Sequence, residues 1–218
     1  MEPLLLKVQD TITSIATDPH DIAALDNDFS EYQGSLRTLL SPYAVSYEKC
    51  FGKPIKTFTI TIPIDYKNTD SIDRYMAQEK KKGAFINSNF CDKKFARASY
   101  KPIPGKEYGV EIIPTLTSVE SRVCLGFLKS KEAVLTSGQG LVAVLELARK
   151  RFPSEIAVVS YDIPKSKVDK EEVDHLCKIN GASWVARATI IDSRLRFGLH
   201  SYDTNLEKGA CLLAFFEK

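Results

Sequence analysis

Two closely spaced glycines, Gly138 and Gly140, separate a short apolar segment from a strongly amphipathic one. A second apolar segment, residues 155–160, follows and ends near Asp162. A strand, a G-x-G-x-x-A turn, a helix, a strand and an acidic residue form the order of a dinucleotide-binding unit. There the glycines let the backbone approach a pyrophosphate at the helix N-terminus, and the acid receives a ribose hydroxyl. Gly138, Gly140 and Asp162 are therefore the candidate cofactor-binding residues.

The same residues also describe a tight turn that leads into a core helix. The motif comes late in the chain, after segments with the alternation of antiparallel strands, whereas a dinucleotide-binding motif should open a parallel α/β domain. The pattern favours the structural interpretation, and we expect no bound cofactor.

A second candidate site is the segment 90–108, in which cations alternate with aromatic rings. Such alternation can hold single-stranded nucleic acid through phosphate contacts and base stacking. The candidate contact residues are Lys93, Lys94, Arg97 and Lys101. The simpler interpretation, which we favour, is that Phe95 and Tyr100 anchor a loop to the core while the lysines are solvated.

The histidines, cysteines and serines form no recognisable catalytic or metal-binding pattern. His175 has Cys177 two residues later, but residues at that spacing do not share a helical face. The five scattered cysteines, without a C-x-x-C pair, argue against a zinc cluster and a disulfide framework and favour a reducing cytoplasm. No G-x-S-x-G sequence marks a nucleophilic serine. We predict no metal site and leave open whether the chain is an enzyme.

Composition and charge fit an ordinary soluble protein. The 218 residues are 44% hydrophobic and 27% charged, and no apolar run approaches the roughly 20 residues that span a bilayer. The net charge of +2 is unevenly distributed: residues 1–50 carry three basic and eight acidic side chains, and residues 51–110 carry twelve and six. A nucleic-acid-binding region usually has a larger excess of basic over acidic residues than this.

Residues 1–48 are predicted to form an N-terminal helical hairpin. Apolar residues recur there at three- and four-residue spacing in two stretches, which Asp18 and Pro19 separate. We expect the hairpin to pack on its own domain, or to form an interface with a protein partner or a second copy of the chain.

Residues 52–218 are predicted to form one domain, which makes the whole chain an α+β protein with a mostly antiparallel sheet and about three helices. Alternating or apolar segments predict strands over residues 57–62, 110–116, 123–127, 155–161, 184–191, 195–202 and 210–216. Helical spacing predicts helices over 69–82, 140–152 and 173–179. The short polar turn at Asp192 and Ser193 indicates an antiparallel hairpin.

From Lys56 onward, the order of segments resembles a diffuse group of bacterial conserved hypothetical proteins of unestablished function. The similar segments are Thr57–Ile62 with Asp65 and Tyr66, Ile86–Phe90 with Lys94 and Phe95, Gly140–Pro153, and Cys211–Phe216. The third begins in that group with glycine, arginine, proline and alanine, in place of which this chain has Gly138, Gln139 and Gly140. A looser, fold-level similarity runs to C-type-lectin-like modules, which also place a core helix after a turn and end on an apolar strand; it implies no activity.

The lack of a catalytic signature and the segregated charges favour a non-catalytic cytoplasmic protein that binds a ligand or a partner, without membrane association. Two alternatives stay open. One is a nucleotide- or dinucleotide-using enzyme with phosphate at the Gly138–Gly140 turn. The other is a single-stranded nucleic-acid-binding protein that uses the segment 90–108.

Overall fold

The computed structural model describes residues 46–164, 166–168 and 171–218. The chain divides into the units Met1–Ser46 and Tyr47–Lys218, and all of the following helices and strands belong to the second unit. Its α-helices are α3 (Tyr47–Cys50), α4 (Ser71–Lys81), α5 (Asp92–Phe95), α6 (Ser121–Ser130) and α7 (Ser137–Ala148), with 3-10 turns η2 (Asn68–Asp70) and η3 (Arg149–Arg151).

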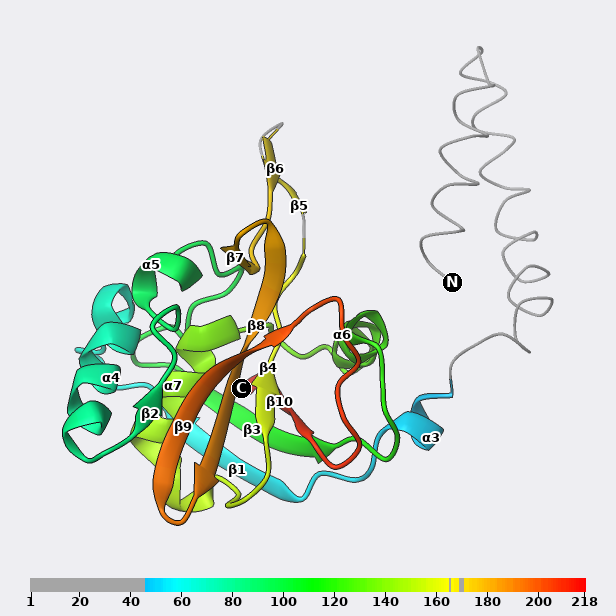
Figure 1. The fold of residues 1–218 in the computed structure, drawn as a ribbon, viewed down its shortest axis with the longest axis horizontal. Helices are drawn as coiled ribbons and strands as arrows, with labels where there is room; N and C mark the ends of the chain where they lie inside the picture. The colour runs from blue at the N-terminus through cyan, green and yellow to red at the C-terminus, as the bar shows by residue number, and fades with distance from the viewer. Residues whose placement is uncertain (1–45, 165, 169–170) are drawn as a thin grey trace. The chain divides into compact units, whose positions relative to one another are not determined.

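Eight strands form one sheet at the centre of this unit (Figure 1). They are β1 (Lys56–Thr61), β2 (Phe85–Ile86), β3 (Glu107–Pro114), β4 (Val158–Ser160), β7 (Cys177–Ile179), β8 (Ala182–Ile191), β9 (Arg194–Ser201) and β10 (Cys211–Glu217). Their order is β1-β3-β10-β4-β8-β9-β2, and β7 pairs with β8. A separate two-stranded sheet pairs β5 (Ser166–Val168) with β6 (Glu171–Val173).

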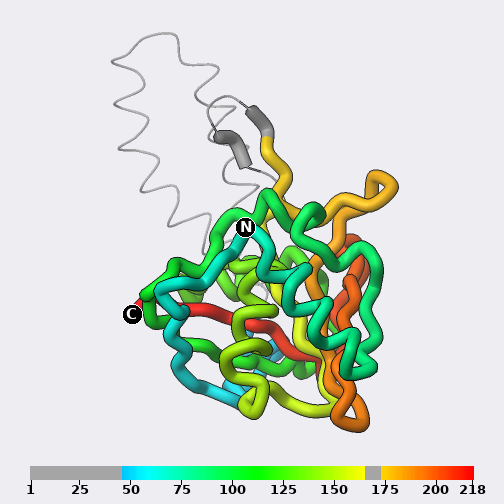
Figure 2. Tube along the Cα trace, turned by 90° about the vertical axis from the view of Figure 1, so that its left-hand side faces the viewer, coloured from blue at the N-terminus to red at the C-terminus, as the bar shows by residue number. Residues whose placement is uncertain are grey.

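Helices cover both faces of the central strands of the sheet, because these strands are apolar on both sides. Ile112 and Leu213 belong to the core cluster under α4, α5 and α7, whereas their neighbours Ile113 and Leu212 belong to the cluster under α6. Figure 2 shows the last strand, β10, in red, running through the middle of the domain beneath α7. A strand buried on both faces has a nearly continuous apolar sequence.

The sheet is mixed. β10 is antiparallel to β3 but parallel to β4, and β2 at the edge is parallel to β9. The other pairs of the sheet are antiparallel, including the predicted hairpin of β8 and β9 around Asp192 and Ser193, which is confirmed.

The fold class predicted from the sequence was wrong. The predicted helical hairpin is not seen, since residues 1–45 lie outside the described residues. The described chain has a mixed eight-stranded sheet with five short α-helices in place of a mostly antiparallel sheet with about three.

Two segments have a different secondary structure from the one predicted. Residues 123–127 belong to α6, where Cys124 and Leu128, four residues apart, bury one helical stripe. Residues 173–179, predicted as a helix, end β6 and form β7. Asn180 and Gly181 have positive φ angles of 50° and 81°, so they form the tight turn of the hairpin from β7 to β8.

Candidate functional site

The glycine turn at the start of α7 is filled by neighbouring side chains. A Cβ atom on Gly138 would lie 3.0 Å from Cγ of Phe95, and one on Gly140 would lie 1.8 Å from Oγ1 of Thr136. The Gln139 side chain donates from Nε2 to the backbone oxygen of Phe95 at 2.9 Å. Both glycines are buried, so their lack of a side chain serves close packing against α5 and Thr136.

The segments on either side of α7 run in opposite directions along β10. Val134, before the helix, forms an antiparallel bridge with Phe215, whereas β4, after it, is parallel to β10. A dinucleotide-binding unit needs two parallel strands joined by the helix. This geometry favours the interpretation of the turn as the start of a core helix.

Asp162, the predicted ribose contact, lies just after β4 and is fully buried. Its carboxylate accepts hydrogen bonds from the backbone N–H of Ile163 at 2.8 Å and from the backbone N–H and hydroxyl of Ser99. Burial raises the pKa of Asp162 to about 6, although the bonds from Ser99 and Ile163 work in the opposite direction. The carboxylate is therefore directed at the loop after α5.

The predicted nucleic-acid contacts lie in α5 and in that same loop. Lys93 and Lys94 belong to α5, and Lys94 donates from Nζ to the backbone oxygen of Lys178 at 3.2 Å. Arg97 and Lys101 are exposed in the loop. The buried ring of Phe95 anchors the segment, as predicted. The structure thus brings the two predicted sites together, because the basic segment packs over the glycine turn and binds Asp162.

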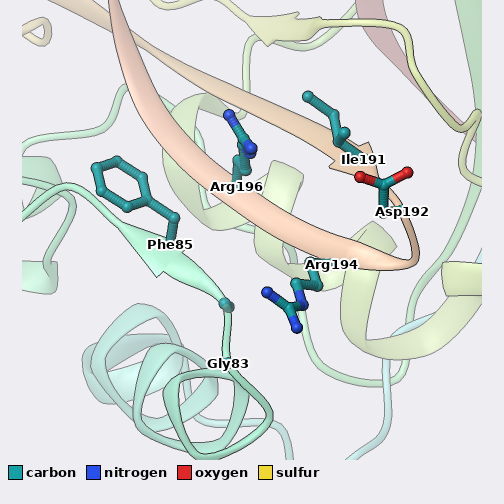
Figure 3. Close-up of a pocket in the computed structure, with 7 residues that line it drawn as sticks. Gly83, Phe85, Ile191, Asp192, Arg194 and Arg196 are labelled. Atoms are coloured by element: carbon teal, nitrogen blue, oxygen red, sulfur yellow. The ribbon is translucent and has the colours of Figure 1, made fainter.

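A different surface of the domain carries a groove open to solvent, here named the β2–β9 groove (Figure 3). It has a volume of about 680 Å³ and lies where β2 pairs with β9 at the edge of the sheet. Its lining residues are Gly83, Ala84, Phe85, Ile191, Asp192, Arg194 and Arg196.

Strand alternation places Arg194, Arg196 and Phe85 of this groove on one face of the sheet. Leu195 and Phe197 are each 1% exposed in the core under α7, so Arg194 and Arg196 project from the opposite face of β9. Phe85 pairs in register with Arg196 in the parallel ladder and therefore shares that face, where its side chain is 69% exposed. In Figure 3 the Arg194 side chain extends from β9 toward Gly83.

The same face continues onto β8. Thr189 lies opposite Arg196, and Arg187 lies opposite Gly198. A Cβ atom on Gly198 would meet no described residue within 4 Å, so none of the described side chains covers the sheet at this point. The open sheet face beside the groove therefore carries a third arginine, Arg187.

The charge of this surface is net positive, because it carries three arginines and one carboxylate, Asp192, and no ion pair among the described residues joins Asp192 to any of the three. Among the described residues, no ion pair involves Arg187, Arg194 or Arg196, whereas Arg74, Arg122 and Arg149 each pair with an acid. Burial lowers the pKa of His200, and the charge of Arg187 lowers it further. The surface therefore presents arginine donors to any anion that reaches it.

A buried carboxylate ties the two walls of the groove together. Glu79 of α4 is 1% exposed and forms ion pairs with Arg149 and, at 2.7 Å, with Lys82. Arg149 also donates to the backbone oxygen of Ser193 in the turn from β8 to β9, at 3.4 Å. Burial raises the pKa of Glu79, but the hydrogen bonds from Lys82 and Arg149 outweigh this effect and hold the pKa below its usual value.

The prediction from sequence missed this groove. The alternation of Arg194 and Arg196 with Leu195 and Phe197 was the available signal, because it indicates cations on the open face of a strand. The position of Phe85 was out of reach, since β2 has only two residues and pairs with a strand far along the chain.

No protein-family model, curated protein or solved structure matches the chain. The two resemblances noted from the sequence therefore stay predictions. Across the part of the chain that the structure describes, no helix is long and apolar enough to cross a membrane. The described residues also contain no group of three or more His, Cys, Asp or Glu side chains that could hold a metal ion.

Proposed function

We propose that the chain is a binding protein that takes an anionic ligand, one with phosphate or carboxylate groups, in the β2–β9 groove. The observation that supports this proposal is a set of three arginines that form no ion pair among the described residues: Arg194 and Arg196 line the open groove, and Arg187 lies beside it on β8. A guanidinium presents a planar fork of N–H donors that matches the geometry of phosphate and carboxylate oxygens. Arginines held on a strand of the sheet are also well positioned, because the strand fixes their spacing.

The lining of the groove favours binding over chemistry. Its described residues offer two guanidinium groups, one ring and one carboxylate, Asp192, but no serine, cysteine, lysine or histidine. Asp162, the carboxyl group with the strongly raised pKa, is buried in the core and accepts hydrogen bonds from Ser99 and Ile163. Guanidinium groups bind and orient an anion. A carboxyl group with a shifted pKa in a cleft would instead indicate acid–base catalysis.

Isothermal titration calorimetry with inorganic polyphosphate at low salt tests the proposal. The Arg194→Gln/Arg196→Gln variant should bind at least about tenfold more weakly, because a hydrogen bond to a charged group contributes about 1.5–3 kcal/mol. The Lys93→Gln/Lys101→Gln variant is the matched control, since it removes the same charge from two exposed side chains of the other candidate segment.

The control separates the two surfaces. The proposal predicts that the lysine variant keeps most of its affinity and that both variants melt at the temperature of the unchanged protein. A loss confined to the lysine variant would move the anion site to residues 93–101 and would contradict the proposal. Equal losses in both variants would mean that net charge, without a defined groove, accounts for binding.

A further inference from the structure

On the basis of the anion site proposed above, we propose that its ligand is single-stranded nucleic acid, with phosphates on Arg194 and Arg196 and a base stacked on Phe85. Single-stranded nucleic acid offers negative charge and flat apolar rings in alternation. The β2–β9 groove presents the complementary pair, two guanidinium groups and an aromatic ring, on one face of adjacent strands.

Phe85 is the aromatic member of the exposed apolar side chains. Its ring is 69% exposed, and the other large apolar side chains exposed among the described residues are aliphatic: Ile55, Ile64, Ile103, Leu116 and Leu147. An exposed ring beside a guanidinium group is a stacking platform, because every base has a π face that can lie on it. Neither an inorganic anion nor a carboxylate side chain would use this ring.

The spacing of the arginines suits an extended polyanion. Arg194 and Arg196 are two residues apart on β9, about 7 Å along the strand, which is comparable to the separation of successive phosphates in an extended single strand. Phe85 lies on the next strand, about 5 Å to the side. A sugar–phosphate backbone that follows β9 can therefore place a base over β2.

The open sheet face beside the groove offers one more contact for a phosphate. Arg187 and Gly198 lie opposite each other on β8 and β9, on the face that carries Arg196. A third phosphate contact at Arg187 would continue the strand across the sheet. A duplex would present phosphates to the arginines but would keep its bases stacked inside, out of reach of Phe85.

The experiment compares four probes by equilibrium binding to the full chain. They are a fluorescent single-stranded oligonucleotide of about 12 nucleotides, within the usual site size of a single binding module, its duplex form, inorganic polyphosphate and polyglutamate. We expect the single strand to bind more tightly than the duplex and polyglutamate. Phe85→Leu should weaken binding of the single strand at least about fivefold, because stacking contributes about 1–3 kcal/mol per base, and should leave polyphosphate binding within about twofold.

Phe216→Leu is the control for Phe85→Leu, since Phe216 is a half-buried ring on the same face of the sheet but on the central strand β10, away from β2 and β9. Phe216→Leu should leave the affinities for the single strand and for polyphosphate unchanged. The Arg194→Gln/Arg196→Gln variant should weaken binding of both the single strand and polyphosphate. It should also reduce the slope of log affinity against log salt for the single strand by about 1.4, at about 0.7 for each phosphate that the variant no longer neutralises.

The outcomes separate the two proposals. If the arginine variant loses polyphosphate binding while Phe85→Leu binds the single strand normally, or if polyglutamate binds as tightly as the single strand, the ligand class is wrong and the anion site stands. If the arginine variant binds every probe unchanged, both proposals fail.

Discussion

At the scale of single residues, Asp162 is a carboxyl group that folding makes harder to ionise. Burial raises its pKa from the ordinary value near 4 to about 6. Between these two values the folded chain holds a proton that the unfolded chain has already lost. The free energy of unfolding contributed by this group therefore falls as the pH rises from about 4 to about 6.

Asp162→Asn should remove this titration and flatten the pH dependence of stability in that window. The unchanged protein should lose about 2–3 kcal/mol across it from this one group, at 1.36 kcal/mol for each unit of pKa difference. Urea unfolding at several pH values between 4 and 7 measures the effect. Ser99→Ala should extend the window above pH 6, because it removes a hydrogen bond to the ionised form. Identical slopes in Asp162→Asn and the unchanged protein would contradict this account.

At the scale of elements, the first turn of α7 depends on glycine for its contacts. Gly140→Ala should lower the free energy of unfolding by about 1–3 kcal/mol, because the new Cβ would lie 1.8 Å from Oγ1 of Thr136 in a buried turn. Gly198→Ala is the matched control: its Cβ meets no atom of the described residues within 4 Å, and alanine suits a strand better than glycine. Urea unfolding of the two variants provides the comparison, and equal costs would show that packing does not explain Gly140.

Elements that are specified by a local sequence pattern were predictable from the sequence. The helices predicted over 69–82 and 140–152 are confirmed as α4 and α7, and the hairpin of β8 and β9 follows from two alternating segments around a two-residue turn. The Asn180–Gly181 pair was an equally strong hairpin signal that the helical interpretation of residues 173–179 overlooked.

Features that depend on distant contacts were not predictable. The parallel pairing of β4 with β10, and of β2 with β9, joins segments far apart in the chain, and no local pattern specifies it. The same limit applies to the site. The cations of β9 are visible in the sequence, but their neighbour Phe85 is placed by that distant pairing.

At the scale of the whole molecule, Glu79 links α4 to η3 and, through Arg149, to the turn from β8 to β9. Arg149→Met should lower the free energy of unfolding by about 2 kcal/mol near neutral pH, because it leaves a buried carboxylate with Lys82 alone. Glu79→Gln/Arg149→Met should recover part of that loss, since it removes the charge as well. A double-mutant cycle in urea measures both effects, and additive losses would show that the pair is not coupled.

The pH dependence of this link has the opposite sign to that of Asp162. The pKa of Glu79 is lowered in the folded chain, so its contribution to stability is present above the unfolded pKa near 4.5 and is lost as the pH falls through the lower, folded value. Arg149→Met should also weaken polyphosphate binding, although Arg149 does not line the groove. The variant loses the hydrogen bond that holds Ser193 beside the β2–β9 groove.

The central position of β10 constrains the order in which a nascent chain can fold. In the sheet that the described residues form, β3 and β4 share no ladder and are joined through residues 211–217, which leave the ribosome after the other seven strands of that sheet. Until then β3 and β4 each present an open edge, and unpaired strand edges promote aggregation during synthesis. Synonymous changes that slow translation just before residue 211 should therefore lower the yield of folded protein more than the same changes placed after residue 46.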